Sequence, residues 1–376
     1  MRATFSCAAI CALLSFAFAV SCNSPASQPS SSSSGSSEEN DWATSKSQQT
    51  PLNVIGSSYN SPQALSISTL AWEDGIYISR DGLNLYCTFF SMDALKAAMD
   101  GATPLTFYLY ERGPMLGQDF SNPIAGSTVP WLHADIAIAQ RQSQSATFGA
   151  WQLTGIKGKY YNRGAAQGIL NSTDSAKYDF FFYTDDSPGC TKIFMATSES
   201  VALSATGSQI NIQGEQTTYR EDNPHCERVG SNLLLFFESD DTRPGGMGAQ
   251  DIWYTISSDN GSTWAAPVNV SSVNTSGYDG QPHLYNDGSA WWLYCTQTNP
   301  ADGKLAIWRY KQGSDGDWNS WTSKGLVVAA GTTQGVGEPS LTSSGDLYFV
   351  AIFKKTVNAT SYDTYDADPY WMKKNY

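Results

Sequence analysis

Short runs in which apolar and polar residues alternate recur along most of this 376-residue chain. Four segments share an acidic or polar start, a strand-like run, a glycine-containing turn and an aromatic run. They are "EDGIYISRDGLNLYCTFF" from Glu73, "EDNPHCERVGSNLLLFFES" from Glu221, "DGQPHLYNDGSAWWLYCTQ" from Asp279 and "GEPSLTSSGDLYFVAIF" from Gly337. A weaker fifth copy, "QGILNSTDSAKYDFFFYTD", begins at Gln167. Alternation with period two between turn residues predicts antiparallel strands.

The spacing of the copies predicts the architecture. The last four begin about 57 residues apart, and each copy is followed by a third strand-like run, such as "AQDIWYTIS" and "KLAIWRYKQ". Regularly spaced strands of this kind predict an all-β fold, a five-bladed β-propeller over residues 51–376. Six blades are the alternative, because the first unit is longer and "LTFYLYERG" in it could form an extra strand. A helix-like stretch, "MDALKAAMD", also lies in this unit.

The two ends of the chain predict how the ring closes. The chain ends after the third strand of the last copy, so its last blade lacks a fourth strand. "PLNV" at 51–54 resembles "PVNV" at 267–270, which follows a third strand. We therefore expect the N-terminal "PLNV" to pair with the C-terminal "YWMKK", which would leave fewer exposed sheet edges.

The composition excludes some classes of function. The net charge of −13 argues against nucleic acid as a partner, because phosphate binding requires clustered Lys and Arg. Three His, without zinc-type spacing, predict no metal and no cofactor. The acids Asp363, Asp366 and Asp368 could ligate Ca²⁺, although a loop before the last strand explains them equally well. Cys87, Cys190, Cys226 and Cys295 leave any disulfide pairing open.

The N-terminus predicts export. Arg2 precedes an apolar run too short for a membrane span, so residues 1–21 are expected to be a signal peptide. "AVSC", ending at Cys22, resembles the lipobox of bacterial lipoproteins, although Ala19 stands where that family usually has Leu. The resemblance implies lipidation of Cys22 (palmitate or a similar acyl chain) and attachment to the outer membrane or cell surface. Residues 22–50 are Ser-rich and nearly devoid of apolar residues, which predicts a disordered tether.

One turn resembles a known motif. Ser257-x-Asp259-x-Gly261-x-Thr263-Trp264 matches the Asp-box of sialidases and related propellers, a structural turn remote from the sialidase active centre. The repeated units also resemble TolB-type propellers of the bacterial envelope. The arginine pattern on which sialidases depend has no counterpart here, so sialidase activity is the least favoured enzyme alternative.

A second enzyme alternative comes from the acids at the strand starts. Five-bladed glycosidases of the arabinanase and β-xylosidase type place carboxylates at the starts of the innermost strands. That resemblance implies Asp74 as base, Asp222 as a charge-tuning neighbour and Glu221 or Glu338 as acid. Clustered carboxylates raise the pKa of one member, as a general acid requires.

The sequence favours a binding module over an enzyme, because no complete catalytic motif is present. His225 and His283 share one register in "DNPH" and "GQPH", and with Asp279 they are candidate binding residues. The expected ligand is a glycan or an envelope protein, bound by a monomer that is anchored to the membrane by its lipid. Whether two acids from different blades face one pocket is the observation that separates the two functions.

Overall fold

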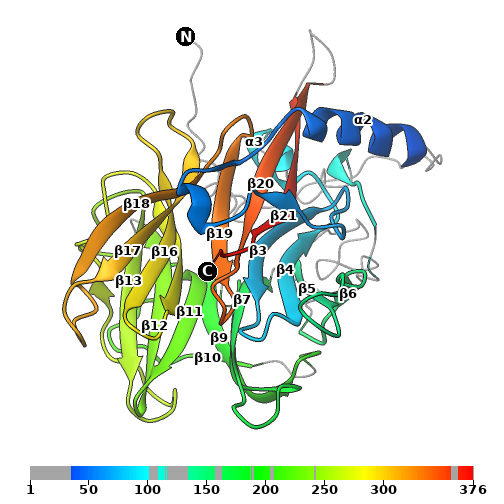
Figure 1. Cartoon of the computed structure of the whole chain (residues 1–376). Helices are drawn as coiled ribbons and strands as arrows, with labels where there is room; N and C mark the ends of the chain where they lie inside the picture. Colours follow the sequence, from blue (N-terminus) through cyan, green and yellow to red (C-terminus); the bar gives the residue numbers. More distant parts are fainter. Residues whose placement is uncertain are drawn as a thin grey trace, which may run out of the picture.

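The computed structural model describes most of the chain. The described residues are 35–100, 109–114, 116, 134–156, 163–186, 188, 190–203, 207–240, 243–356 and 363–375. Within them, five antiparallel sheets stand around one axis, which makes the protein a five-bladed β-propeller (Figure 1). The predicted fold class is confirmed, and the six-bladed alternative is wrong. "LTFYLYERG" lies partly outside the described residues, and its end contributes only the isolated bridge between Glu111 and Met92.

Each blade runs outward from the axis in chain order. Blade one contains β3 (Trp72–Ile78), β4 (Asn84–Phe90), β5 (Asp135–Gln140) and β6 (Gln152–Leu153). Blade two contains β7 (Arg163–Leu170), β8 (Lys177–Asp185), β9 (Lys192–Ser200) and β10 (Ser208–Gln209). Blade three contains β11 (Asp222–Val229), β12 (Asn232–Asp240), β13 (Gln250–Ser257) and β14 (Val268–Asn269).

The last two blades combine strands from both ends of the chain. Blade four contains β15 (Asp279–Asn286), β16 (Trp291–Thr298), β17 (Leu305–Gln312), β18 (Trp321–Ala329) and β1 (Leu52–Asn53). Blade five contains β19 (Gly335–Leu341), β20 (Leu347–Thr356), β21 (Asp363–Met372) and β2 (Gln63–Ala64). The remaining elements are α2 (Gly35–Ser47), the 3₁₀ turn η1 (Gly56–Ser58) and α3 (Ala94–Met99), which lies in the predicted helix-like stretch.

An N-terminal strand closes the ring, but it is not the strand that we predicted. β2 pairs with β21 through Gln63–Trp371 and Ala64–Tyr370, whereas "PLNV" contributes β1, which pairs with β18. The prediction failed because the similarity to "PVNV" is local, and β18 is a long strand whose outer edge was open to a fifth strand. Between β1 and β2 the chain crosses to blade five, where Tyr59 bridges Lys374.

The hydrophobic core is divided among the interfaces between neighbouring blades. Tyr86 of blade one packs with Phe181 of blade two, and Phe182 of blade two packs with Trp264 of blade three. Comparable buried clusters join blades three and four, four and five, and five and one. Because both faces of a blade pack against neighbouring blades, the second strands are buried along most of their length.

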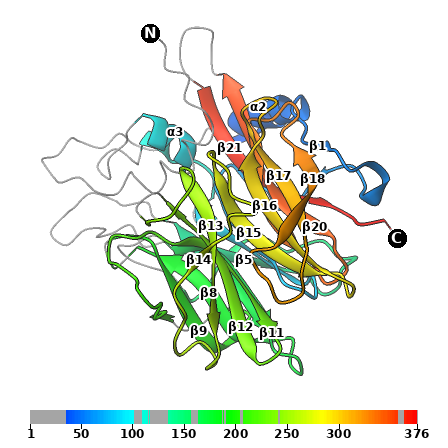
Figure 2. The ribbon, with the colours of Figure 1, turned by 90° about the vertical axis from the view of Figure 1, so that its left-hand side faces the viewer.

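The helix α2 lies within the segment predicted as a flexible tether. It packs across the outer end of β20 and β21 (Figures 1 and 2), where Trp42 is 1% exposed and Ser45 donates to the Lys354 carbonyl (3.2 Å). The composition predicted disorder because Trp42 is the one large apolar residue of this segment. The helix is held in addition by the ion pairs of Lys46 with Asp366 and Asp368. Residues 1–34, including Cys22, lie outside the described residues. No helix in the described part of the chain is long and apolar enough to cross a membrane.

The turn at Ser257–Trp264 joins β13 and β14, as predicted. Asp259 Oδ1 accepts from the Thr263 amide (2.9 Å), and Ser257 Oγ accepts from the Gly261 amide (2.8 Å). Gly261 has a φ of +85°, which favours glycine. Trp264 is buried between blades two and three, so this turn stabilises the fold.

Candidate active site

The five innermost strands begin with the same irregularity. Each forms one to three pairs with the second strand of its blade and then has a bulge. In blade one the bulge lies between Asp74 and Tyr77, and the other blades have it at the equivalent place. The bulged residue is left-handed in four blades: Gly75 (φ 55°), Asn223 (48°), Gln281 (53°) and Glu338 (60°). Left-handed backbone is strained in non-glycine residues and collects at functional sites. The bulge turns successive side chains in different directions at one end of the channel.

Below the bulges, five hydrogen bonds connect each inner strand to the next around the ring. The bonds are Tyr77 Oη to the Gly168 carbonyl (2.6 Å), the Cys226 amide to Gln167 Oε1 (3.0 Å), His225 to the Leu284 backbone, the Leu341 amide to His283 Nε2 (3.0 Å) and the Ile78 amide to Ser340 Oγ (3.0 Å). The shared register of the two "PH" motifs therefore has a structural use in closing the ring. His283 Nε2 accepts the hydrogen bond from the Leu341 amide and therefore carries no proton of its own, which keeps the ring neutral.

Arg80 closes the far end of the channel. Its guanidinium donates to the carbonyls of Leu284 (2.5 Å) and Leu341 (2.9 Å) and forms an ion pair with Glu227. His225 lies 3.2 Å from Glu227 Oε1, and the two imidazole centroids are 4.1 Å apart. Burial lowers the pKa of both histidines, most strongly that of His283. The two histidines are therefore buried neutral groups inside the channel.

A narrow depression of about 310 Å³, including its open mouth, follows the axis above these histidines. Each blade contributes to its described lining, which consists of Gly75, Ile76, Tyr77, Gln167, Asn223, Pro224, His225, Gln281, Pro282, His283, Glu338, Pro339 and Ser340. No Lys or Arg belongs to this lining. A ligand with a negative charge would find no counter-charge among these described residues.

Two carboxyl groups from neighbouring blades are in direct contact beside the depression: Glu338 lines it, and Asp74 precedes the lining residue Gly75. Burial and the nearby charge of Asp74 raise the pKa of Glu338 far above its usual value, and a hydrogen bond with Asp74 raises it further. Burial also raises the pKa of Asp74, but the hydrogen bonds from Trp72 (3.0 Å) and Glu338 lower it. Glu338 is therefore the proton donor in this contact and Asp74 the acceptor.

Blade three contributes a second pair of acids to the same cluster. Burial and the charge of Asp74 raise the pKa of Asp222 to about 6, while a hydrogen bond from Thr184 opposes the rise. Burial and the charge of Asp222 raise the pKa of Glu238 to about 8. Asp74 and Asp222 are half-buried, whereas Glu238 is 3% exposed. The mouth thus combines an acid that stays protonated with a carboxylate that is charged at neutral pH.

Sequence reasoning missed Glu238, although the repeat contains a signal for it. The residue opposite the bulge on the second strand is Thr88, Thr184 and Thr296 in blades one, two and four. Blade three has Glu238 at that position, paired with Asp222. An ionisable side chain where three copies have Thr is the departure that alignment of the repeats would have revealed.

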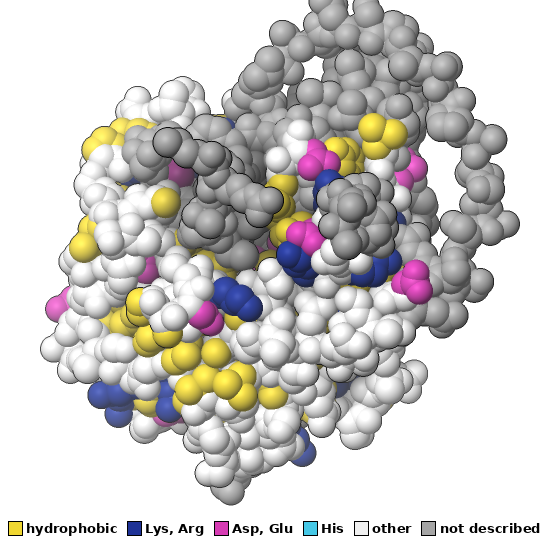
Figure 3. All heavy atoms as spheres, turned by 90° about the horizontal axis from the view of Figure 1, so that it is seen from above, with side chains coloured by type: hydrophobic (Ala, Val, Ile, Leu, Met, Phe, Trp, Pro, Cys, Tyr) yellow, Lys and Arg dark blue, Asp and Glu magenta, His cyan; other side chains and the backbone are white. Residues whose placement is uncertain are grey.

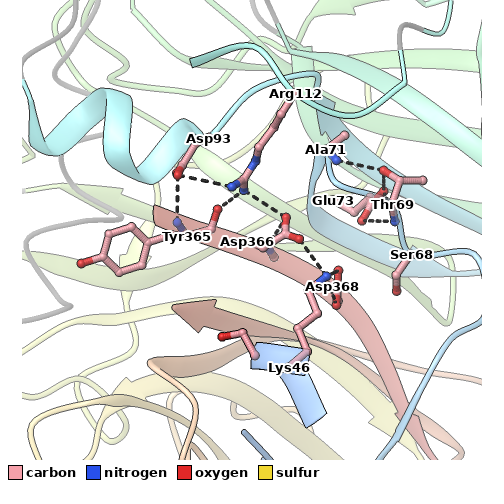
Figure 4. Close-up of polar contacts among 12 residues, drawn as sticks. Lys46, Ser68, Thr69, Ala71, Glu73, Asp93, Arg112, Tyr365, Asp366 and Asp368 are labelled. Atoms are coloured by element: carbon pink, nitrogen blue, oxygen red, sulfur yellow. Dashed lines mark hydrogen bonds and ion pairs between the residues drawn. The ribbon is translucent and has the colours of Figure 1, made fainter. Parts of the chain in front are cut away.

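The acids that directly precede Asp74, Asp222 and Gly280 face the interior of the blades instead. Glu73 accepts from the Thr69 amide (3.1 Å) and hydroxyl (2.5 Å; Figure 4), and Asp279 accepts from the Thr275 amide (2.6 Å) and hydroxyl (2.8 Å). Glu221 pairs with Lys192 (3.2 Å) and Arg243 (2.6 Å). The structure therefore places Asp74, Asp222 and Glu338 together but keeps Glu221 and Asp279 apart from them.

A separate buried ion cluster lies beside Glu73 (Figure 4). Lys46 of α2 contacts Asp366 (2.7 Å) and Asp368 (2.7 Å), and Arg112 contacts Asp366 (3.1 Å) and Asp93 (3.4 Å). Asp366 and Asp368, two of the acids that we considered as Ca²⁺ ligands, are therefore already paired with Lys46 or Arg112. Asp363 forms an ion pair with Lys354 (2.7 Å). In the described part of the chain, no group of three or more His, Cys, Asp or Glu residues could hold a metal ion.

The surface charge and the cysteines complete the description of the residues around the site. Viewed from above (Figure 3), acidic and basic side chains are interspersed among the residues that the structure describes, so this face carries no broad field of one sign. Cys87, Cys190, Cys226 and Cys295 are all free thiols. Three of them are buried in the blades.

Comparisons with known proteins give similarities of fold alone. No family model and no curated protein sequence matches the chain. Among solved structures, an α-L-arabinofuranosidase from Lactobacillus brevis aligns over 81% of this chain and 92% of its own, at 12% identity and a TM-score of 0.46. The catalytic domain of the Coprinopsis cinerea GH62 α-L-arabinofuranosidase aligns over 87% and 96%, at 10% and 0.49. A xylan β-1,4-xylosidase from Bacillus halodurans aligns over 82% and 54%, at 11% and 0.48.

Proposed function

We propose that the chain is a glycoside hydrolase that acts at the channel mouth. The observation that carries the proposal is the contact of Glu338, which holds its proton, with Asp74, and the presence of Asp222 of another blade nearby. A pair of acids whose environments separate their protonation states is what glycoside hydrolysis requires. This conclusion reverses the preference for a binding module that the sequence suggested.

The roles differ from those suggested by resemblance. Glu338 protonates the leaving oxygen. Asp222 activates the attacking water, because it belongs to blade three, is half-buried and directly precedes Asn223, which lines the depression. Asp74 contacts Glu338 directly, and an inverting pair needs roughly 6.5 to 9.5 Å between its carboxyl groups to admit water. Asp74 therefore keeps the proton on Glu338, and the product is expected to have inverted anomeric configuration.

The lining favours an uncharged sugar as substrate. With no Lys or Arg among the described residues of the depression, a sialic or uronic acid has no partner for its carboxylate. The cluster of carboxyl groups would also repel it. Sialidase activity remains the weaker alternative for this reason.

The experiment is a screen of aryl glycosides of neutral furanose and pyranose sugars. Wild type should release the chromophore from at least one, and Asp222→Asn should reduce kcat by about a hundredfold or more, as removal of a general base does. Asp279→Asn, a strand-start aspartate that faces its own blade, is the matched control and should keep its activity. Turnover in Asp222→Asn at the wild-type rate, or no turnover by wild type on the whole panel, would exclude this mechanism.

We also propose that the enzyme is exported and attached to the envelope through a lipid on Cys22. The support is the sequence alone: the apolar run and "AVSC" that precede a Ser-rich stretch. The Cys22→Ala variant should leave the membrane fraction of the native host or remain uncleaved. Unchanged membrane partitioning of the variant would disprove lipidation at this residue.

A further inference from the structure

Glu238 replaces the small hydroxyl side chain that three other blades have at its position. Its longer side chain reaches from β12 to the first strand of blade four. The approach is close enough that a Cβ on Gly280 would lie 2.1 Å from Glu238 Oε2. Glycine at 280 is therefore a condition for this contact, and the two residues form one feature of the mouth.

One oxygen of Glu238 receives two hydrogen bonds from blade four. The Gln281 amide donates to Oε2 (2.7 Å), and Tyr278 Oη donates to the same oxygen (3.0 Å). The Asn223 side chain also bonds to Glu238. Glu238 thereby fixes the left-handed backbone of Gln281, whose φ is 53°.

Gln281 in turn fixes the acid of blade five. Its side-chain amide donates to Glu338 Oε1, and its Oε1 accepts from the Glu338 amide (3.0 Å). The chain of contacts thus runs from Glu238 through Gln281 to Glu338 and on to Asp74. Resting on the proposed function, we propose that Glu238 is a positioning residue, which sets the orientation of Glu338 through Gln281.

The state of Glu238 makes a sharp test available. Because burial and Asp222 raise its pKa to about 8, Glu238 is mostly protonated at neutral pH. A glutamine has nearly the same shape and keeps one oxygen that accepts from Tyr278 and Gln281. Threonine, the residue of the other blades, is too short to reach them. A positioning role therefore predicts that Glu238→Gln behaves like wild type and Glu238→Thr does not.

The experiment compares these two variants with Asp251→Asn, which alters a buried carboxylate of the same blade outside the site. Glu238→Thr should lower kcat by about tenfold to a hundredfold with little change in KM, as small misplacement of a catalytic group does. The kcat of Glu238→Gln should stay within about threefold of the wild-type value, and Asp251→Asn should keep the wild-type kcat. A tenfold change in kcat corresponds to about 1.4 kcal/mol in the activation free energy. Equal damage by Gln and Thr, or none by Thr, would overturn the proposal.

A second measurement does not depend on turnover. Hydrogen exchange at the Gln281 amide should accelerate in Glu238→Thr and remain slow in Glu238→Gln. If Glu238→Thr does not fold, Tyr278→Phe removes one of the two donors and should change kcat in the same direction by less. An inactive wild type with the expected exchange pattern defeats the proposed function but supports the contact chain. Unchanged exchange in Glu238→Thr overturns the contact chain itself.

Discussion

Adjacent acids in this propeller have opposite environments. Glu73 and Glu221 face the interior of their blades, where backbone amides, hydroxyls and cations bind them. Asp74 and Asp222, one residue further on, lie at the channel mouth and interact with acids of other blades. The strand alternates its sides at this point, so a shift of one residue decides whether a carboxylate stabilises the fold or is available for chemistry. Glu73 and Glu221 are fully buried and Asp74 and Asp222 are half-buried, so the two groups differ in exposure as well as in their partners.

The largest effect is expected from the channel side of this comparison. Glu338→Gln removes the proton donor but keeps a side chain of the same size, so kcat on a glycoside with a poor leaving group should fall by about 10²- to 10⁴-fold. A leaving group of low pKa needs no proton, so on a dinitrophenyl glycoside the loss should be much smaller. Steady-state kinetics on both substrates measures the difference. An equal loss on both would remove Glu338 from the role of acid.

On the blade side, the largest effect should concern stability. Lys192 contacts Glu215 (2.7 Å) and Glu221 (3.2 Å), and its side chain is 2% exposed. Lys192→Met leaves two carboxylates to share Arg243, so the free energy of unfolding should fall by about 3–5 kcal/mol. Urea denaturation provides the measurement, with Lys177→Met as control. The exposed pair of Lys177 with Asp174 should contribute no more than about 1 kcal/mol. Similar values for both variants would contradict the difference between buried and exposed pairs.

The fold was predictable because its signal repeats. Five copies of one pattern predicted five antiparallel sheets and their order along the chain, and the motif ending at Trp264 predicted a turn between two strands. The assignment of "PLNV" failed because two short strands, β1 and β2, compete for two open edges, and four letters do not determine a register. The candidate site was predictable only as a set of strand-start acids.

The sequence could not tell which of these acids face the channel and which face the interior of a blade. Three bulges, after Asp74, Asp222 and Gly337, determine which side chains reach the mouth. A bulge is a feature of backbone geometry that several residue types tolerate, so these residues alone do not predict it. Asn223, Gln281 and Glu338 are left-handed without being glycine. Glu238 was missed because second strands were read only for their apolar pattern.

The pH dependence would sharpen the comparison. The pKa of Asp222 is about 6, raised by burial and by Asp74, so kcat/KM should fall about tenfold per pH unit below that value, as the base becomes protonated. The hydrogen bond from Thr184 lowers the pKa of Asp222, so Thr184→Val should move this limb to higher pH. Thr255→Val, which removes a hydroxyl bonded to the Ala265 carbonyl (2.6 Å) away from the mouth, should leave it in place. A limb that moves to lower pH in Thr184→Val would contradict the assignment of Asp222 as base.

The smallest effect on activity is expected from Asp279→Asn. Asp279 Oδ2 accepts from the Thr275 amide and hydroxyl, and Oδ1 accepts from Gln297 (2.5 Å). An asparagine turns one acceptor into a donor that faces a donor, which should lower the free energy of unfolding by about 1–3 kcal/mol. Since the side chain points away from the mouth, kcat/KM of the folded variant should change by less than about twofold. A tenfold change would correspond to about 1.4 kcal/mol in the activation free energy. Thermal denaturation and kinetics on one preparation, with Asp222→Asn beside it, measure both quantities. A large loss of kcat/KM without loss of stability would place Asp279 in the site and abolish the distinction between acids that face the blade and acids that face the channel.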